Sequence, residues 1–230
     1  MMAARAFAFI IVAVATAACG GAATVAVDPT AAPTTAAPTT AAAATATAGA
    51  LAWTVSDKSK ATVRVREHLV GVNLPSDAVL TANGAKGSFT LNADGTFASG
   101  SKLTFDLTTL SSDNRDRDNF VKQDTLGTRQ FPTATFIPVK ASGLTLPLPA
   151  SGELTFTLTG TLTIRGKDKT VTFDIKATRN GADLTATATA NPSLTFEDFG
   201  MTAPSVPFRV VSVTDEIRLI IELVATGPAS

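Results

Sequence analysis

Strict alternation of apolar and polar residues is the feature that most limits how this 230-residue chain folds. In ELTFTLTGTLTIRG, residues 153–166, Leu, Phe and Ile occupy the even positions, and threonines fill most of the odd ones. Such alternation with β-branched residues predicts a strand with one apolar and one polar face. The pattern recurs in four further segments: KATVRVRE (60–67), KLTFDLTTL (102–110), KTVTFDIKA (169–177) and DLTATATA (183–190).

Turn signals separate these segments and predict hairpins. They are NADG at 92–95, RGKDK at 165–169 and RNGAD at 179–183, where Asn180-Gly181 suits a type I′ turn. We therefore predict an all-β fold, an antiparallel, lipocalin-like β-barrel of about eight strands. A closed sheet of this size is either filled by its side chains or holds one small ligand, and alternation does not separate the two.

Two features favour a hollow barrel. The segment at 184–190 directs only Leu and Ala inward, which leaves space opposite bulkier neighbours. The chain has 13 phenylalanines and no tyrosine, so the aromatic residues of the interior carry no phenolic hydroxyls. Such a cavity suits an apolar chain better than a sugar or a peptide.

The first 50 residues have a different composition. After Arg5 the apolar run AFAFIIVAVATAA has the length of a signal-peptide core and is too short to span a bilayer. It leads into Cys19, the only cysteine, in a context that resembles the lipobox of bacterial lipoproteins, with Thr16 where an aliphatic residue is usual. We predict a lipoprotein signal peptide at 1–18, a disordered Ala/Thr/Pro-rich tether at 19–50 that begins with lipidated Cys19, and the barrel domain at 51–230. Ordinary signal cleavage near Cys19 is the alternative.

Composition also excludes several functions. The 19 basic and 19 acidic residues balance, which gives no electrostatic reason to bind nucleic acid. One histidine and one lipidated cysteine do not make a usual zinc site, so no metal and no cofactor are expected. The sequence has no G-x-S-x-G nucleophile motif, and we do not expect an enzyme.

The segment SSDNRDRDNFVKQDTLGTRQFPTATF, residues 111–136, breaks the alternation, and we expect a short helix or ordered loop between about 113 and 126. Its DNRDRDNF, TL and FPTATF motifs resemble the YceI-like family of bacterial polyisoprenoid-binding proteins. HL at 68–69, GTLTIRGKDKTVTFDI at 160–175, FEDFGM at 196–201 and DEIRLIIELVA at 215–225 agree with it in order. The resemblance spans residues 53–226. It implies an exported, extended lipocalin-type barrel whose pore takes up an isoprenoid or similar amphiphile.

We predict that the ligand contacts the inward-facing residues of this pore. They are Phe105, Leu107, Phe136, Phe156, Leu158, Leu162, Phe173, Ile175, Ala186 and Ala188. His68, Arg115 and Arg117 are candidates for contacts with a polar head group. The alternatives are a structural histidine at a strand end, and arginines that pair with the neighbouring aspartates to fix the loop.

The sequence thus favours a carrier that binds and sequesters or transports an isoprenoid or similar lipid ligand. A structural or adhesive surface domain without ligand is the alternative. The protein is expected to be exported and held on the membrane by its lipid anchor, facing the periplasm or the extracellular side. The resemblance and the edges of an imperfectly closed barrel are compatible with a homodimer.

If Cys19 is the attachment site, Cys19→Ala should move the protein from the membrane fraction to the soluble exported fraction, because the acyl chains provide the anchor. Fractionation followed by immunoblotting measures this. Identical partitioning of the variant and the parent would contradict the anchor.

Overall fold

The computed structural model describes residues 49–205 and 209–228. The predicted signal peptide, Cys19 and nearly all of the predicted tether lie outside the described residues. Among the helices that are described, none has the length and hydropathy needed to cross a bilayer.

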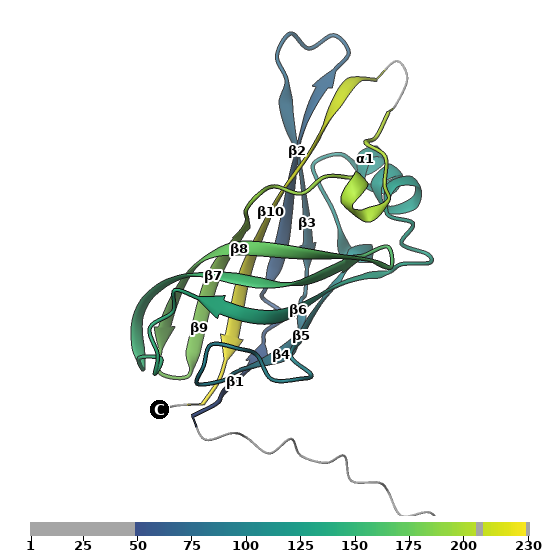
Figure 1. Ribbon diagram of the computed structural model, residues 1–230. Helices are drawn as coiled ribbons and strands as arrows, with labels where there is room; N and C mark the ends of the chain where they lie inside the picture. The colour runs from purple at the N-terminus through teal and green to yellow at the C-terminus, as the bar shows by residue number, and fades with distance from the viewer. Residues whose placement is uncertain (1–48, 206–208, 229–230) are drawn as a thin grey trace, which may run out of the picture. The chain divides into compact units, whose positions relative to one another are not determined.

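The described residues form one antiparallel sheet of ten strands with little helix (Figure 1), which confirms the predicted fold class. The strands are β1 (Leu51–Val55), β2 (Lys60–Leu69), β3 (Ser76–Asn83), β4 (Lys86–Leu91), β5 (Lys102–Asp106), β6 (Thr133–Ser142), β7 (Ser151–Ile164), β8 (Lys167–Asn180), β9 (Asp183–Ala190) and β10 (Val210–Thr226). The short helices are η1 (Leu107–Thr109), α1 (Arg115–Phe120), the π-helix η2 (Val121–Thr125) and η3 (Glu197–Phe199).

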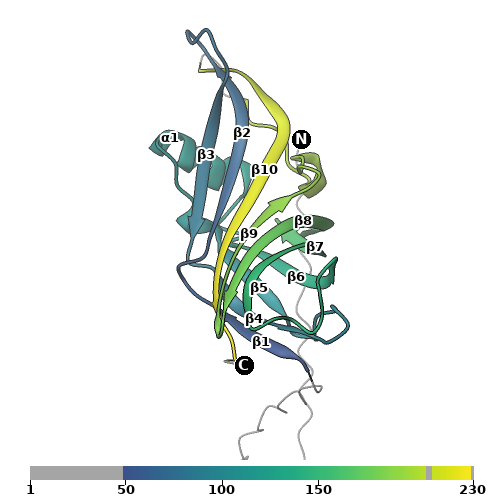
Figure 2. The ribbon, with the colours of Figure 1, turned by 90° about the vertical axis from the view of Figure 1, so that its left-hand side faces the viewer.

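Eight of the strands close into a ring. The sheet runs β1-β4-β5-β6-β7-β8-β9-β10, and β10 pairs back with β1 through Thr54 and Thr226. The remaining two strands, β2 and β3, continue β1 and β4 upward. The N-terminal part of β10 pairs with β2, and β2 pairs with β3. Figure 2 shows β2, β3 and β10 side by side above β1. The barrel therefore has a lower part closed by β1 and β4, and an upper part in which β2 and β3 take their place.

Residues 51–69 and 76–91 thus form one long hairpin that bends between its two parts. Ser59, which is fully buried, holds the bend. Its hydroxyl donates to Val224 O at 3.1 Å and accepts from Val224 N at 2.9 Å, and its carbonyl accepts from Gly84 N at 3.2 Å. At the break between β1 and β2, the side chain thereby gives Val224 N an acceptor, while Val224 O also accepts from Ser56 N at 2.8 Å.

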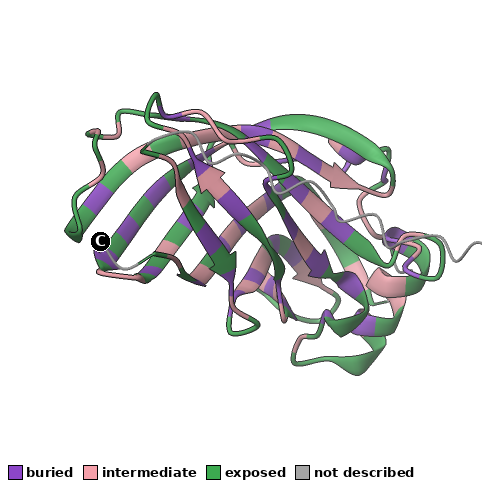
Figure 3. Ribbon diagram, turned by 90° about the horizontal axis from the view of Figure 1, so that it is seen from below, coloured by how far each residue is buried: buried purple, intermediate pink, exposed green. Residues whose placement is uncertain are grey.

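Buried and exposed residues alternate along the strands, as Figure 3 shows from below. On β8, Val171, Phe173, Ile175 and Ala177 are buried while the intervening residues are exposed or half-buried. Thr155 and Thr157 of β7 are exposed on the outer face. The period-two pattern of the sequence therefore gives the faces of these strands correctly.

The hairpin turns differ from the prediction in one place. Asn180 pairs with Asp183, so the two turn residues are Gly181 and Ala182, and only Gly181 has a positive φ, 59°. The turn between β7 and β8 instead has positive φ at both central residues, 52° at Arg165 and 69° at Gly166, as a type I′ turn requires. The prediction of a type I′ turn at Asn180-Gly181 was wrong, because Asn180 is the last residue of the ladder.

The expected helical segment near 113–126 is confirmed as α1 followed by η2. The Asn114 side chain caps α1 by accepting hydrogen bonds from Asp116 N at 2.9 Å and Arg117 N at 3.1 Å. This segment and the loop around η3 flank the upper part of the barrel.

Because Val224 N donates to the hydroxyl of the fully buried Ser59, Ser59→Ala should leave this backbone N–H without its partner. We expect a loss of about 1–3 kcal/mol in the free energy of unfolding, measured by urea denaturation. Ser88→Ala, a matched change at an exposed position of β4, is the control and should stay within about 0.5 kcal/mol of the parent. Equal effects of the two substitutions would show that the hydroxyl does not hold the bend.

Candidate ligand-binding cavities

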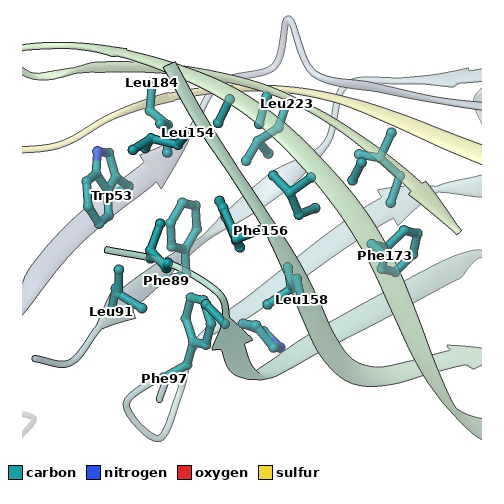
Figure 4. A pocket seen from close by; sticks show the side chains of 18 of the residues that line it. Trp53, Phe89, Leu91, Phe97, Leu154, Phe156, Leu158, Phe173, Leu184 and Leu223 are labelled. Atoms are coloured by element: carbon teal, nitrogen blue, oxygen red, sulfur yellow. The ribbon is translucent and has the colours of Figure 1, made fainter. Parts of the chain in front are cut away.

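The lower part of the barrel encloses a narrow apolar cavity of about 90 Å³ (Figure 4). Trp53 and Phe89 stack there with their ring centroids 5.5 Å apart, and Phe97 meets Phe89 edge-on at 6.2 Å. Leu154, Phe156 and Leu158 of β7 point into the same space. The side chains of this part nearly fill the interior, which leaves little room for a ligand.

The loop between β6 and β7 contributes Leu144 and Leu148 to the lower cavity. Arg179, with 1% of its surface exposed, fixes this loop from β8. Its guanidinium donates to Pro149 O at 3.0 Å and to Gly181 O at 3.0 Å, and lies 5.6 Å from the centroid of the Trp53 ring. The loop is therefore a fixed part of the lower wall.

The upper part holds a larger cavity of about 490 Å³. Its walls are the inner faces of β2 and β3, the N-terminal part of β10, the helical segment α1–η2 and the residues around η3. Most of its lining is apolar: Val63, Val65, Leu69, Ala78, Leu80, Leu107, Leu110, Phe120, Val121, Leu126, Ile164, Phe196, Met201, Pro204, Val210, Val213 and Ile217. A volume in this range suits a small organic ligand, for which pockets typically measure ~300–1,000 Å³.

One end of the upper cavity is polar. Arg117 of α1 donates to Glu67 of β2 at 2.7 Å and to Asp113 at 2.5 Å. Glu67 is buried on the inner face of the barrel, and only 19% of the Arg117 side chain is exposed. Arg209 pairs with Asp116 at 3.0 Å nearby. Both guanidinium groups at this end therefore already face carboxylates.

The η3 segment closes the upper wall where β9 has ended. Leu194 bridges to Ile217 of β10, and Phe196 N donates to Asp215 at 2.8 Å. Asp198 accepts hydrogen bonds from Lys169 of β8 at 2.5 Å and from Thr195 N at 3.0 Å. The hydrogen bond from Lys169 is the main cause that holds the pKa of the Asp198 carboxyl below its usual value.

The predicted ligand residues separate into three groups. Seven of them line the lower cavity: Phe136, Phe156, Leu158, Phe173, Ile175, Ala186 and Ala188. Leu107 and Arg117 line the upper cavity. Phe105 and Leu162 are buried between the two cavities and line neither, and their contact with a ligand stays a prediction.

The other two head-group candidates lie away from the cavity linings. His68 Nε2 lies 2.9 Å from Val72 O in the β2–β3 hairpin. Arg115 is exposed at the first position of α1. Among the described residues, no three His, Cys, Asp or Glu side chains gather as a metal site would require.

Sequence reasoning missed most of the upper cavity. The alternation in residues 60–67 already placed Val63 and Val65 on an apolar face, so the sequence pattern could have identified these two residues. Glu67 lies on the same inward face, but an apolar pattern does not predict that a charged side chain lies inside the barrel. Phe120, Val121 and Leu126 depend on how the helical segment docks on the barrel, which no local pattern in the sequence reports.

Comparisons with known proteins agree with this architecture. The family model of the YceI-like domain matches residues 53–225. A solved polyisoprenoid binding domain from Saccharophagus degradans is 12% identical, with a TM-score of 0.56, 77% of this chain covered and 99% of that chain. A mutant YceI protein from Campylobacter jejuni is 20% identical, with a TM-score of 0.52 and coverages of 68% and 89%. No curated protein matches the chain. At these identities the solved structures show a shared fold.

The Lys169–Asp198 pair predicts a pH dependence of stability. A carboxyl whose pKa is lower in the folded state than in the unfolded state stabilises the folded state at pH values above the usual pKa of 3.8. This contribution disappears as the pH falls through the pKa of the folded state. Asp198→Asn should therefore cost roughly 0.2–1 kcal/mol at neutral pH, as for a partly exposed ion pair, and should reduce the stability lost on acidification. Urea denaturation at neutral pH and below pH 3.8 measures both effects.

Glu197→Gln, at the exposed neighbouring position, is the matched control for that change. An acid sensitivity that Asp198→Asn leaves as large as in the parent would contradict the assignment to this pair.

Proposed function

This chain belongs to the YceI-like domain family, and we propose that its barrel binds and carries an isoprenoid or similar amphiphilic lipid in the upper cavity. The observation that carries the proposal is the upper cavity itself, about 490 Å³ of largely apolar space with one polar end. The similar domain from Saccharophagus degradans is described as polyisoprenoid binding, which supports this class of ligand.

The apolar walls supply the affinity. Burial of apolar ligand surface contributes about 25 cal/mol per Å², and the gain must exceed the entropy lost on association. A branched hydrocarbon chain against Val63, Leu80 and Ile217 has no polar atoms that would lose hydrogen bonds to water. An isoprenoid therefore fits these walls better than a sugar or a peptide does.

The charges at the polar end favour an uncharged head group. Glu67 and Asp116 already face Arg117 and Arg209 there, and Asp113 also pairs with Arg117, so the described residues leave no unbalanced positive charge at this end. A diphosphate would have to displace a carboxylate from the largely buried Arg117. This displacement costs more free energy than the binding of an alcohol or a quinone, which has only to accept one hydrogen bond. We propose that such a neutral head group lies beside Arg117.

The structural or adhesive alternative corresponds to a barrel that is filled throughout. The lower part, with about 90 Å³ of free space, resembles such a barrel. The upper part favours the carrier, because a ligand would cover apolar walls that are otherwise left in contact with water. We further propose that the domain is exported and anchored through Cys19 at the cell envelope, on the basis of the N-terminal sequence.

A matched pair of substitutions tests the proposal. Ala78 of β3 lines the upper cavity and Ala188 of β9 lines the lower one, and both are buried. Ala78→Trp should place the indole in free space, abolish binding of farnesol and leave the free energy of unfolding within about 1 kcal/mol of the parent. Ala188→Trp should overpack the narrow cavity and cost about 1–3 kcal/mol. Native mass spectrometry and urea denaturation measure the two effects.

Farnesyl diphosphate is the second probe, because it shares the chain of farnesol and differs in its head group. Binding of the parent to farnesol in preference to farnesyl diphosphate supports the neutral head group, and the reverse order contradicts it. If the parent binds neither compound and no apolar mass is purified with it, the carrier is overturned in favour of the structural domain.

A further inference from the structure

The two cavities lie in one barrel, and on each of three strands one buried residue lies between the residues that line the lower cavity and those that line the upper one. On β5 and its continuation, Leu103 lines the lower cavity and Leu107 the upper one, and Phe105 lies between them. On β10, Leu219 lies between Ile221 below and Ile217 above. On β7, Leu162 lies between Leu158 below and Ile164 above. We call Phe105, Leu162 and Leu219 the partition.

The partition is tightly packed. Phe105 has 3% of its surface exposed, Leu162 2% and Leu219 7%, although the residues on either side border open space. Ala134, which pairs with Phe105 across the ladder, is also buried and lines neither cavity. At these three positions, close-packed side chains therefore lie between the linings of the two cavities.

Two aromatic rings support the partition from below. The ring of Phe136 lies against Gly160, where a Cβ atom would come within 2.4 Å of it, and Phe136 pairs with Leu162 across the ladder. Phe173 meets Phe136 edge-on, with the ring centroids 5.3 Å apart. A side chain of the partition therefore has little space into which to move.

We propose that the partition is the length-determining element of the ligand site, which stops the tail of the bound chain and sets how many isoprene units the barrel buries. The proposal rests on the proposed function and adds the chain-length specificity and the residues that set it. The polar end formed by Glu67 and Arg117 holds the head group, so the tail extends from there towards Phe105. Units beyond the length of the upper cavity stay in contact with water and add nothing to the affinity.

Removal of the partition should join the two cavities. Leu103, Phe136 and Leu158 lie directly below it, so a longer tail would then continue along apolar surface. Each additional buried unit adds apolar area and hence affinity. The seven predicted residues of the lower cavity would become ligand contacts only in such a variant.

The experiment compares the full chain with Phe105→Ala and Leu162→Ala. The probes are geraniol, farnesol, geranylgeraniol and octaprenol, titrated one at a time and measured by native mass spectrometry. In the parent, affinity should rise with chain length and then reach a plateau. Each variant should move the plateau to a longer alcohol and gain about tenfold or more in affinity for the longest probe relative to farnesol.

Val55→Ala is the control, because it truncates a buried side chain, 7% exposed, on β1 in the lower part of the barrel, and Val55 lines neither cavity. It should leave the position of the plateau unchanged. Circular dichroism verifies that each variant is folded. If Phe105→Ala does not fold, the milder Phe105→Leu and Leu162→Ala carry the same comparison.

The outcomes separate this proposal from the proposed function. A parent that binds none of the alcohols overturns the carrier itself. In a second outcome, the parent binds the alcohols with the expected plateau while the folded partition variants show the same plateau. That result leaves the carrier in place and overturns the role of the partition. An affinity of the parent that keeps rising through octaprenol also overturns it, because the tail then passes these residues.

Discussion

Closure of the sheet on β10 is the constraint on which the rest of this structure depends. A sheet with one apolar face buries that face only if it packs on another layer or closes on itself. Here β10 pairs with β9 on one side, and with both β1 and β2 on the other. At the bend between β1 and β2, Val224 N donates to the buried hydroxyl of Ser59, and Val224 O accepts from that hydroxyl and from Ser56 N. One strand thereby closes two stacked parts of a barrel.

The two parts have different interiors because their walls are made of different elements. Below, the ring consists of paired strands, and Phe and Leu side chains from opposite sides meet across it. Above, β9 has ended, and the helical segment and the η3 residues complete the wall. These elements do not direct a regular row of side chains inward as a strand does, so the upper part keeps about 490 Å³ of space and the lower part about 90 Å³.

The charged residues at the upper end are arranged to balance one another. Arg117 faces Glu67 and Asp113, and Arg209 faces Asp116, so the polar end offers hydrogen-bond donors without a net positive field. A largely buried ion pair of this kind contributes little net stability, but removal of one partner leaves an uncompensated charge. The pair between α1 and β2 therefore positions the helical segment at the upper cavity.

The sequence by itself determined the fold class, the faces of the strands and the helical segment near 113–126, because alternation and capping residues act over a few neighbouring positions. It placed the type I′ turn in the wrong hairpin, since the register that makes Asn180 a ladder residue depends on the partner strand. It also predicted space beside Ala186 and Ala188, where the tertiary structure brings Phe156 and Leu223 to the same narrow cavity. Only the tertiary structure decided where the barrel is hollow, because free volume depends on which side chains meet across the interior, and those residues are far apart in the chain.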